Sequence, residues 1–150
     1  MSPLAIAVLT ISDSRTPDND TSGDLLVERL TGDGHLLASR DLIPDNVYQI
    51  RATVSNWIAD DTTDVVLTTG GTGFTGRDST PEALLPLFDK TIEGFGELFR
   101  QISYEEIGSS TIQSRAVAGL TNTTLIFAVP GSTNACATAW DHILQNQLDS

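Results

Sequence analysis

The chain has 150 residues, of which 39% are hydrophobic and 19% are charged, and its formal net charge at pH 7 is −12. This size and composition fit a single globular domain over residues 1–150 with a core of its own. The acidic balance argues against a nucleic-acid surface or an anionic-membrane surface, because both need clustered Lys and Arg. No apolar run is long enough to span a membrane, and the one cysteine, Cys136, cannot form an internal disulfide, so we expect a cytoplasmic protein.

The chain begins with a predicted strand and helix. Residues 4–11 form a nearly unbroken aliphatic run, which is typical of a strand covered on both faces. Ser12 and Asp13 follow this run in a polar turn. Capping residues at 20–23 then precede an apolar helical pattern, so the first unit is a strand, a polar loop and a helix.

A second unit of the same kind follows. Residues 36–43 predict a strand, and Pro44 ends it. Asp45 or Asn46 can cap the next helix, whose apolar side chains recur over residues 47–58. A second polar loop is therefore expected at the same edge of the sheet as the first.

The third strand leads into a loop that is unusually rich in glycine. Residues 65–69 are apolar and β-branched, and the seven positions after them contain Gly70, Gly71, Gly73 and Gly76. Glycine permits positive φ angles and lets a ligand approach main-chain N–H groups without meeting a Cβ atom. The loop is the first candidate for a binding site.

A helix start directly after this loop points to an anionic ligand. Ser79 or Thr80 can cap the helix, Pro81 suits its first turn, and Glu82 adds the acidic residue common there. Unpaired N–H groups at a helix start attract phosphate or carboxylate. Since the molecule is acidic overall, we expect a divalent cation such as Mg²⁺ to help hold a phosphate.

Two common phosphate motifs match this loop incompletely. Residues 71–76 spell G-x-G-x-x-G, but the predicted helix begins only near Pro81, which weakens a dinucleotide-binding interpretation. The same residues fit the first part of a P-loop, but Arg77 and Asp78 replace the Lys and the Ser or Thr that it needs. A glycine-rich turn without a ligand is the remaining alternative.

The second half of the chain has a less regular pattern. Glycines at 94–96 interrupt it, residues 98–107 then predict a helix, and residues 114–120 predict a short helix or turn. Residues 123–129 are a clear β-rich strand, and Pro130-Gly131-Ser132 forms a turn before a last helix. Strands that alternate with helices predict an α/β fold of three layers, with a mainly parallel, doubly wound sheet.

Several short motifs stand in order along most of the chain. They are Ile11-Ser12-Asp13, Ile43-Pro44-Asp45, the run from Thr68 to Ala83, Glu93-Gly94-Phe95-Gly96-Glu97, Ser114-Arg115 and Pro130-Gly131-Ser132-Thr133. In these motifs and their order the sequence resembles the MoaB/Mog family of molybdenum cofactor biosynthesis proteins, and most closely its bacterial MoaB branch.

The resemblance implies a function. Members of this family bind molybdopterin, and the Mog-type enzymes transfer AMP from ATP to its terminal phosphate with Mg²⁺. It also implies a homotrimer or a homohexamer. Adenylyl transfer to molybdopterin is therefore expected, and a non-catalytic molybdopterin carrier is the alternative. A nicotinamide enzyme is a third, weaker alternative because of the late helix start.

The resemblance also assigns roles to residues. Asp45 and Asp78 stand at the two acidic positions of the family motifs, where we expect them to bind Mg²⁺ or orient the nucleophile. The alternatives are a helix cap for Asp45, and a solvated loop carboxylate or a partner to Arg77 for Asp78. The expected contacts to the substrate or nucleotide come from loop residues: Ser12, Asp13, Gly70, Gly71, Thr72, Gly73, Ser79, Pro130, Gly131 and Ser132.

Overall fold

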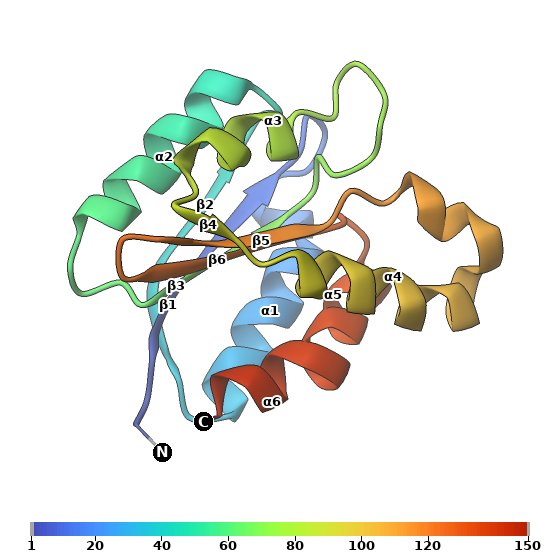
Figure 1. Ribbon diagram of the computed structural model, residues 1–150. Helices are drawn as coiled ribbons and strands as arrows, with labels where there is room; N and C mark the ends of the chain where they lie inside the picture. Colours follow the sequence, from blue (N-terminus) through green and yellow to red (C-terminus); the bar gives the residue numbers. More distant parts are fainter. Residues whose placement is uncertain (1, 150) are drawn as a thin grey trace.

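The computed structural model describes residues 2–149 and arranges them in three layers, a central sheet with helices on both faces (Figure 1). The strands of these residues lie in the order β2-β1-β3-β6-β5-β4. Their bounds are Ala5–Ile11 for β1, Leu36–Ile43 for β2, Val65–Thr69 for β3, Lys90–Thr91 for β4, Val117–Thr121 for β5 and Thr124–Val129 for β6.

The α-helices are α1 (Thr21–Gly32), α2 (Val47–Ala59), α3 (Thr80–Leu84), α4 (Glu93–Ile107), α5 (Thr133–Ala139) and α6 (Gln145–Leu148). Three 3₁₀ segments join them: η1 (Pro17–Asn19), η2 (Leu85–Leu87) and η3 (Gly108–Gln113). A π-helical segment, η4 (Trp140–Leu144), connects α5 to α6.

Four neighbouring strands of the sheet are parallel. β1 pairs in parallel with β2 and β3, and β3 pairs in parallel with β6. β5 and β4 continue the sheet in antiparallel pairs. The predicted α/β fold with a mainly parallel sheet is confirmed, and the antiparallel part is a hairpin with its short edge strand.

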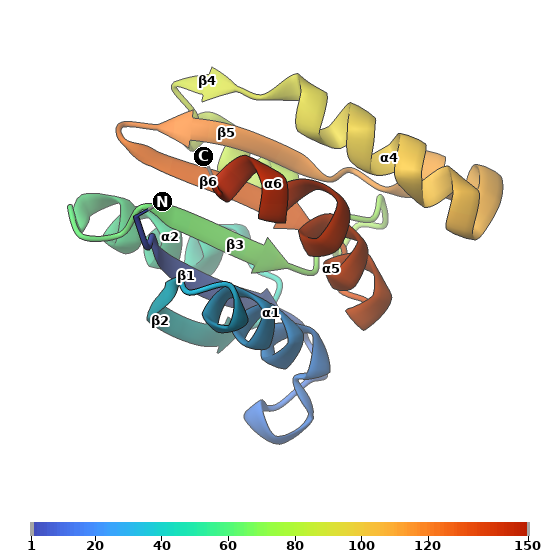
Figure 2. The same ribbon diagram turned by 90° about the horizontal axis from the view of Figure 1, so that it is seen from below.

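Figure 2 shows α1, α5 and α6 on one face of the sheet and α2 on the other. Each face has its own apolar core. On one face, α1, α4, α5, η4 and α6 cover alternate residues of β1, β3 and β6, and Trp140 is completely buried there. The Trp140 Nε1 donates to Asp33 at 2.8 Å, which satisfies the one polar group of this side chain. On the other face, α2 and α3 cover the intervening residues of the same strands. Burial on both faces explains why these strands are aliphatic throughout.

The carboxyl ends of the parallel strands meet at one edge of the sheet. Ile11 of β1 stands opposite Ile43 of β2, and Thr69 of β3 stands opposite Thr10 of β1 and Val129 of β6. The loops that follow these four strands must therefore come together at this edge, as the sequence predicted.

The prediction of a short helix or turn at residues 114–120 was wrong, because these residues lead into and form β5. Val117–Thr121 pairs with β6 and β4. Gly119 has a reason to lie within a strand, since a Cβ atom there would come 2.3 Å from Cγ of Phe88. The glycine leaves room for the Phe88 ring. Because glycine is uncommon inside strands, it also obscures the β pattern in the sequence.

One helix prediction also needs correction. Glycines at 94–96 do not interrupt α4, which begins at Glu93 and includes them. The helix that starts after the glycine-rich loop, α3, is short, since it ends at Leu84 and η2 follows it. Pro86 lacks an N–H group and cannot continue an α-helix at that point. No helix within residues 2–149 is both apolar enough and long enough to cross a membrane.

Candidate functional site

The loops at the carboxyl edge of the sheet contact one another through backbone atoms at glycine positions. Gly70 has φ +110°, and a Cβ atom there would lie 2.0 Å from the Ile11 carbonyl oxygen. A Cβ atom on Gly131 would lie 3.2 Å from Cα of Gly70. Glycine is therefore required where the ends of β1, β3 and β6 converge.

The glycine loop, defined here as residues 70–79, folds back onto the start of α3. Gly71 has φ +70°, and Thr80 donates its N–H to the Gly71 carbonyl at 3.1 Å. The Thr80 hydroxyl donates to the Gly70 carbonyl at 2.9 Å. The prediction of positive φ angles holds for Gly70 and Gly71, the first two glycines of the loop.

Arg115 holds the far side of the glycine loop. Its Nε donates to the Gly73 carbonyl at 2.6 Å, and its Nη2 donates to the Asp78 carbonyl at 2.8 Å. Nη1 pairs with Glu82 of α3, and this pairing lowers the pKa of the Glu82 carboxyl. Arg115 is thus a brace for the loop, and its guanidinium is already engaged.

Asp45 is buried behind the glycine loop. Its Oδ1 accepts hydrogen bonds from the Ser79 N–H, at 3.2 Å, and from the Ser79 hydroxyl. The cap of α2 is Asn46, whose Oδ1 accepts from the N–H groups of residues 48 and 49. The alternative that Asp45 serves as the helix cap is therefore wrong.

Asp78 closes a turn inside the glycine loop. Its Oδ2 accepts from the Thr75 N–H at 3.0 Å and from the Thr75 hydroxyl at 2.7 Å, and it lies against Gly73. In the described part of the chain, no hydrogen bond reaches Oδ2 of Asp45 or Oδ1 of Asp78. Each carboxylate keeps one oxygen available.

Ser12 and Asp13 form a turn and a link to the glycine loop. The Ser12 hydroxyl accepts from the N–H groups of Ser14, at 3.2 Å, and Arg15, at 3.0 Å. Asp13 pairs with Arg77 and accepts from the Asp45 N–H at 3.0 Å. The bond from Arg77 is the main cause that lowers the pKa of Asp13.

Two hydroxyl groups fix the turn formed by residues 130–132 through its backbone carbonyls. The Thr69 hydroxyl donates to the Pro130 carbonyl at 2.9 Å, and the Ser22 hydroxyl donates to the Gly131 carbonyl at 2.7 Å. The Ser132 hydroxyl accepts from the Ala135 N–H at 3.0 Å and caps α5.

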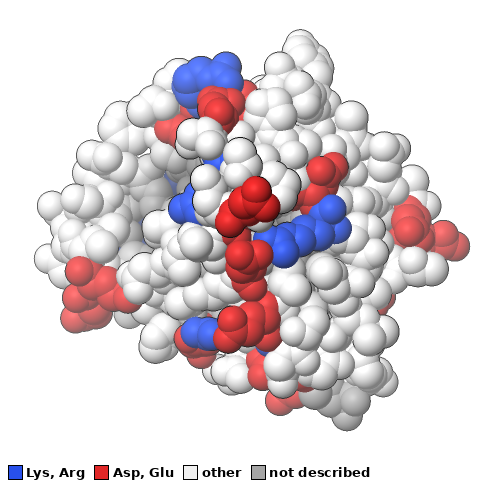
Figure 3. Space-filling view, turned by 180° about the vertical axis from the view of Figure 1, so that it is seen from behind, with Lys and Arg blue, Asp and Glu red and all other residues white. Residues whose placement is uncertain are grey.

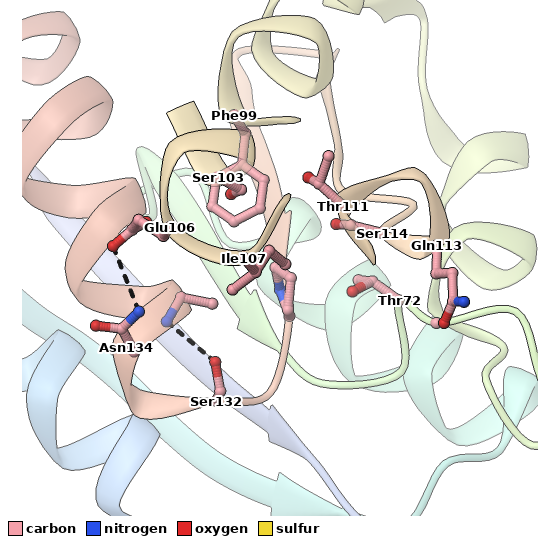
Figure 4. Close-up of a pocket in the computed structure, with 13 residues that line it drawn as sticks. Thr72, Phe99, Ser103, Glu106, Ile107, Thr111, Gln113, Ser114, Ser132 and Asn134 are labelled. Carbon is pink, nitrogen blue, oxygen red and sulfur yellow. Dashed lines mark hydrogen bonds between the residues drawn. The ribbon is translucent and has the colours of Figure 1, made fainter. Parts of the chain in front are cut away.

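A cavity of about 230 Å³ opens between the glycine loop and the 130–132 turn (Figure 4). Of the residues expected to contact a ligand, Thr72, Gly73, Pro130 and Ser132 line it. The other expected residues lie outside its lining. They are Ser12, Asp13, Asp45, Gly70, Gly71, Asp78, Ser79 and Gly131.

The opposite wall of the cavity comes from α4 and η3, which the sequence analysis did not connect with the site. Phe99, Ser103, Glu106 and Ile107 line it from α4. Their spacing of four, three and one places them on one helical face. Two polar side chains on an otherwise apolar helical stripe were the signal that could have found this wall. Thr111, Gln113 and Ser114 complete it, and the Ser114 hydroxyl is buried without a hydrogen-bond partner in the described structure.

Charge on the surface is mixed and mostly acidic. On the face shown in Figure 3, Asp and Glu side chains form a band, with single basic side chains beside them. Within residues 2–149, no group of three or more His, Cys, Asp or Glu side chains could hold a metal ion by itself. Any cation at the glycine loop would therefore need ligand oxygens in addition to protein carboxylates.

Comparison with known proteins gives one consistent result for the sequence. The family model described as "Probable molybdopterin binding domain" matches residues 7–150. "Molybdenum cofactor biosynthesis protein B" of Escherichia coli strain K12 is 57% identical over 148 residues, which cover 99% of this chain and 87% of that protein. The protein of that name in Bacillus subtilis strain 168 is 42% identical over 142 residues, covering 94% and 84%.

Solved structures agree with the sequence comparison. A crystal structure of molybdenum cofactor biosynthesis protein B matches with a TM-score of 0.95 at 43% identity, over 99% of this chain and 92% of that chain. The tungsten cofactor synthesizing protein MoaB from Pyrococcus furiosus matches with a TM-score of 0.89 at 35% identity, over 99% and 95%. The Mog protein from Mycobacterium ulcerans, at 22% identity and a TM-score of 0.86 over 97% of each chain, shares the fold. The chain belongs to the MoaB/Mog family of molybdenum cofactor biosynthesis proteins, and its sequence is similar to those of the MoaB branch.

Proposed function

We propose that this chain acts in molybdenum cofactor biosynthesis, where it binds molybdopterin and transfers AMP from ATP to the terminal phosphate of that molecule. Family membership supports the role in the pathway. The single structural observation that supports binding is the cavity, which has the glycine loop as one wall and the 130–132 turn as another. A glycine-rich backbone, which lets an anion approach main-chain N–H groups, lies next to the apolar side chains of Phe99 and Ile107 and so suits a ligand with a phosphate and a ring.

The proposed reaction is a nucleotidyl transfer. An oxygen of the terminal phosphate of molybdopterin attacks the α-phosphorus of ATP, and a new P–O bond forms. The bond from that phosphorus to the bridging oxygen breaks, and pyrophosphate leaves with the bond electrons. Such a transfer needs two phosphates held in line and their charge offset, with little covalent chemistry by the protein.

The glycine loop would do the positioning. Its glycines allow phosphate oxygens to reach main-chain N–H groups, and Arg115 and Thr80 keep the loop in one shape. Asp45 and Asp78 fit a magnesium site because each has one oxygen that accepts no hydrogen bond from residues 2–149, and both contact the loop. Mg²⁺ is commonly held by one or two carboxylates together with phosphate oxygens, and it would offset the phosphate charge.

A second candidate function is a molybdopterin carrier without turnover. The observation that favours it is the position of Asp45 and Asp78, since neither carboxylate lines the cavity. Binding then depends on the cavity alone, and ATP would not be consumed.

One assay separates these functions. The protein is mixed with molybdopterin, ATP and Mg²⁺, and pyrophosphate release is followed with and without EDTA. Release that requires both molybdopterin and Mg²⁺ supports the adenylyl transfer. Binding of molybdopterin without release supports the carrier. Tight NAD binding that molybdopterin does not affect would contradict both.

A further inference from the structure

The cavity has one ionisable side chain among its described lining residues, Glu106 of α4. Its Oε1 accepts from the Thr138 hydroxyl at 2.7 Å. Its Oε2 accepts only a long bond, 3.4 Å, from Nδ2 of Asn134. A carboxylate can accept about four hydrogen bonds, so Glu106 has capacity left for a ligand.

The two ends of the cavity differ in chemistry. Figure 4 shows Glu106 on one side and Thr72 with Ser114 on the other, with Phe99 and Ile107 between them. The Thr72 end belongs to the glycine loop and includes the unpartnered Ser114 hydroxyl. A bound molecule therefore meets donors at one end, an apolar middle and an anionic acceptor at the other.

We propose that Glu106 recognises the N–H edge of the ligand's heterocyclic ring and so fixes the direction in which the ligand lies. The inference rests on the proposed function, in which the ligand is a pterin with a phosphate. The 2-amino group and the neighbouring ring N–H of a pterin form two parallel donors, which a carboxylate accepts as a pair. The negative charge of Glu106 repels a phosphate from this end and leaves it to the glycine loop.

The ring edge makes the inference testable with two small probes. 6-Hydroxymethylpterin carries the amino group, whereas 6-hydroxymethyllumazine carries a carbonyl there, which would face the Glu106 carboxylate with an acceptor. We expect the unmodified protein to bind the pterin at least about tenfold more tightly than the lumazine, because a carbonyl facing the Glu106 carboxylate sets two acceptors against each other and removes a donor. Displacement of bound molybdopterin reports both affinities.

Matched variants locate the effect. Glu106→Gln should weaken molybdopterin binding about tenfold and abolish the preference for the pterin probe. Glu105→Gln removes the same charge from the next position of α4, outside this cavity, and should behave like the unmodified protein. Thr138→Val removes the hydrogen bond to Glu106 but keeps the carboxylate, and should retain the preference for pterin.

The outcomes are distinct. Equal molybdopterin affinity in Glu106→Gln and Glu105→Gln would overturn the role of Glu106. A loss of affinity in Thr138→Val as large as that in Glu106→Gln would also overturn it, because the packing of α4 on α5 would then explain both losses. If neither small probe displaces molybdopterin, the ratio of the molybdopterin affinities of Glu105→Gln and Glu106→Gln tests the role of Glu106. Failure of the unmodified protein to bind molybdopterin would instead overturn the proposed function.

Discussion

Asp45 and Asp78 each use one carboxylate oxygen to hold the glycine loop and keep the other out of any hydrogen bond in residues 2–149. A structural carboxylate and a metal ligand can thus be the same residue. The two roles separate when the carboxylate becomes an amide, because an amide oxygen still accepts a hydrogen bond but carries no charge.

If the proposed adenylyl transfer occurs, replacement of either aspartate by asparagine should lower its rate by about 100-fold or more, because the Mg²⁺ that offsets the phosphate charge would lose a charged ligand. Thermal unfolding should change little in Asp78→Asn, because the amide oxygen can still accept the hydrogen bonds from Thr75. Asp61→Asn, an exposed carboxylate outside the candidate site, is the control. Full adenylyl transfer by Asp78→Asn with an unchanged Mg²⁺ requirement would remove Asp78 from the mechanism.

Cys136 is fully buried next to the 130–132 turn, and burial raises the pKa of its thiol to about 11. In the unfolded chain the pKa of this thiol is about 8.5. Between these two pH values the unfolded chain has lost a proton that the folded chain keeps, so the free energy of unfolding falls as the pH rises.

We expect Cys136→Ala to remove this part of the alkaline destabilisation. The difference in unfolding free energy between pH 8 and pH 11 should become smaller by an amount on the order of 3 kcal/mol. Denaturant unfolding at both pH values measures it. The native thiol should also react slowly with a disulfide reagent at pH 8. Rapid labelling of the folded protein would contradict this burial.

At the scale of elements, the brace between β5 and the glycine loop depends on the planar guanidinium of Arg115. Its three nitrogen atoms reach Gly73, Asp78 and Glu82, and a lysine ammonium cannot cover these directions at once. The loop is thus tied to the antiparallel part of the sheet as well as to α3.

Arg115→Lys should therefore loosen residues 70–79. We expect amide hydrogen exchange of this loop to become about tenfold faster or more, since one charged hydrogen bond contributes about 1.5–3 kcal/mol. Arg29→Lys is a matched control, because Arg29 pairs with Asp141 and makes no hydrogen bond to the glycine loop among the described residues. Unchanged exchange at the loop would show that its other contacts hold it without the Arg115 guanidinium.

The parts of the fold that the sequence predicted share a simple cause. The aliphatic runs of β1, β3 and β6 are buried on both faces, and this pattern is visible without neighbours. β5 was missed because Gly119 serves the Phe88 ring, which comes from a distant segment. β4 has two residues, Lys90 and Thr91, too few to form a pattern.

Part of the candidate site could also be predicted from the sequence, and part could not. The glycine loop and the 130–132 turn follow recognisable strands, so the sequence could place them at one edge. The polar side chains on the apolar stripe of α4 indicate that this helical face is unusual, but which loops the face meets depends on how α4 packs across the sheet. Likewise, only the folded chain reveals that Asn46, and not Asp45, caps α2.

At the scale of the whole molecule, α4 and η3 each carry a large apolar side chain that is exposed and lies outside the cavity. Tyr104 is 58% exposed and Ile112 is 80% exposed. Large exposed apolar groups in a small acidic protein favour a protein interface. We propose that this surface joins copies of the chain, in line with the expected homotrimer or homohexamer.

Ile112→Asp should shift the protein toward smaller species in sedimentation equilibrium, because it places a charge in the proposed interface. Tyr48→Asp alters an equally exposed aromatic residue on α2 and should leave the association state unchanged. A monomeric unmodified protein at micromolar concentration would refute the proposed assembly.

The contact between Gly70 and Gly131 has a consequence for how two substrates would act together. No side chain separates the two loops there, so a displacement of one backbone would move the other, and under the proposed function the two loops would contact different ligands. A nucleotide pressing on one loop and a pterin pressing on the other would then alter each other's affinity, and thermodynamic linkage makes that effect equal in both directions. Order of addition would change the path to the ternary complex while leaving its final population the same.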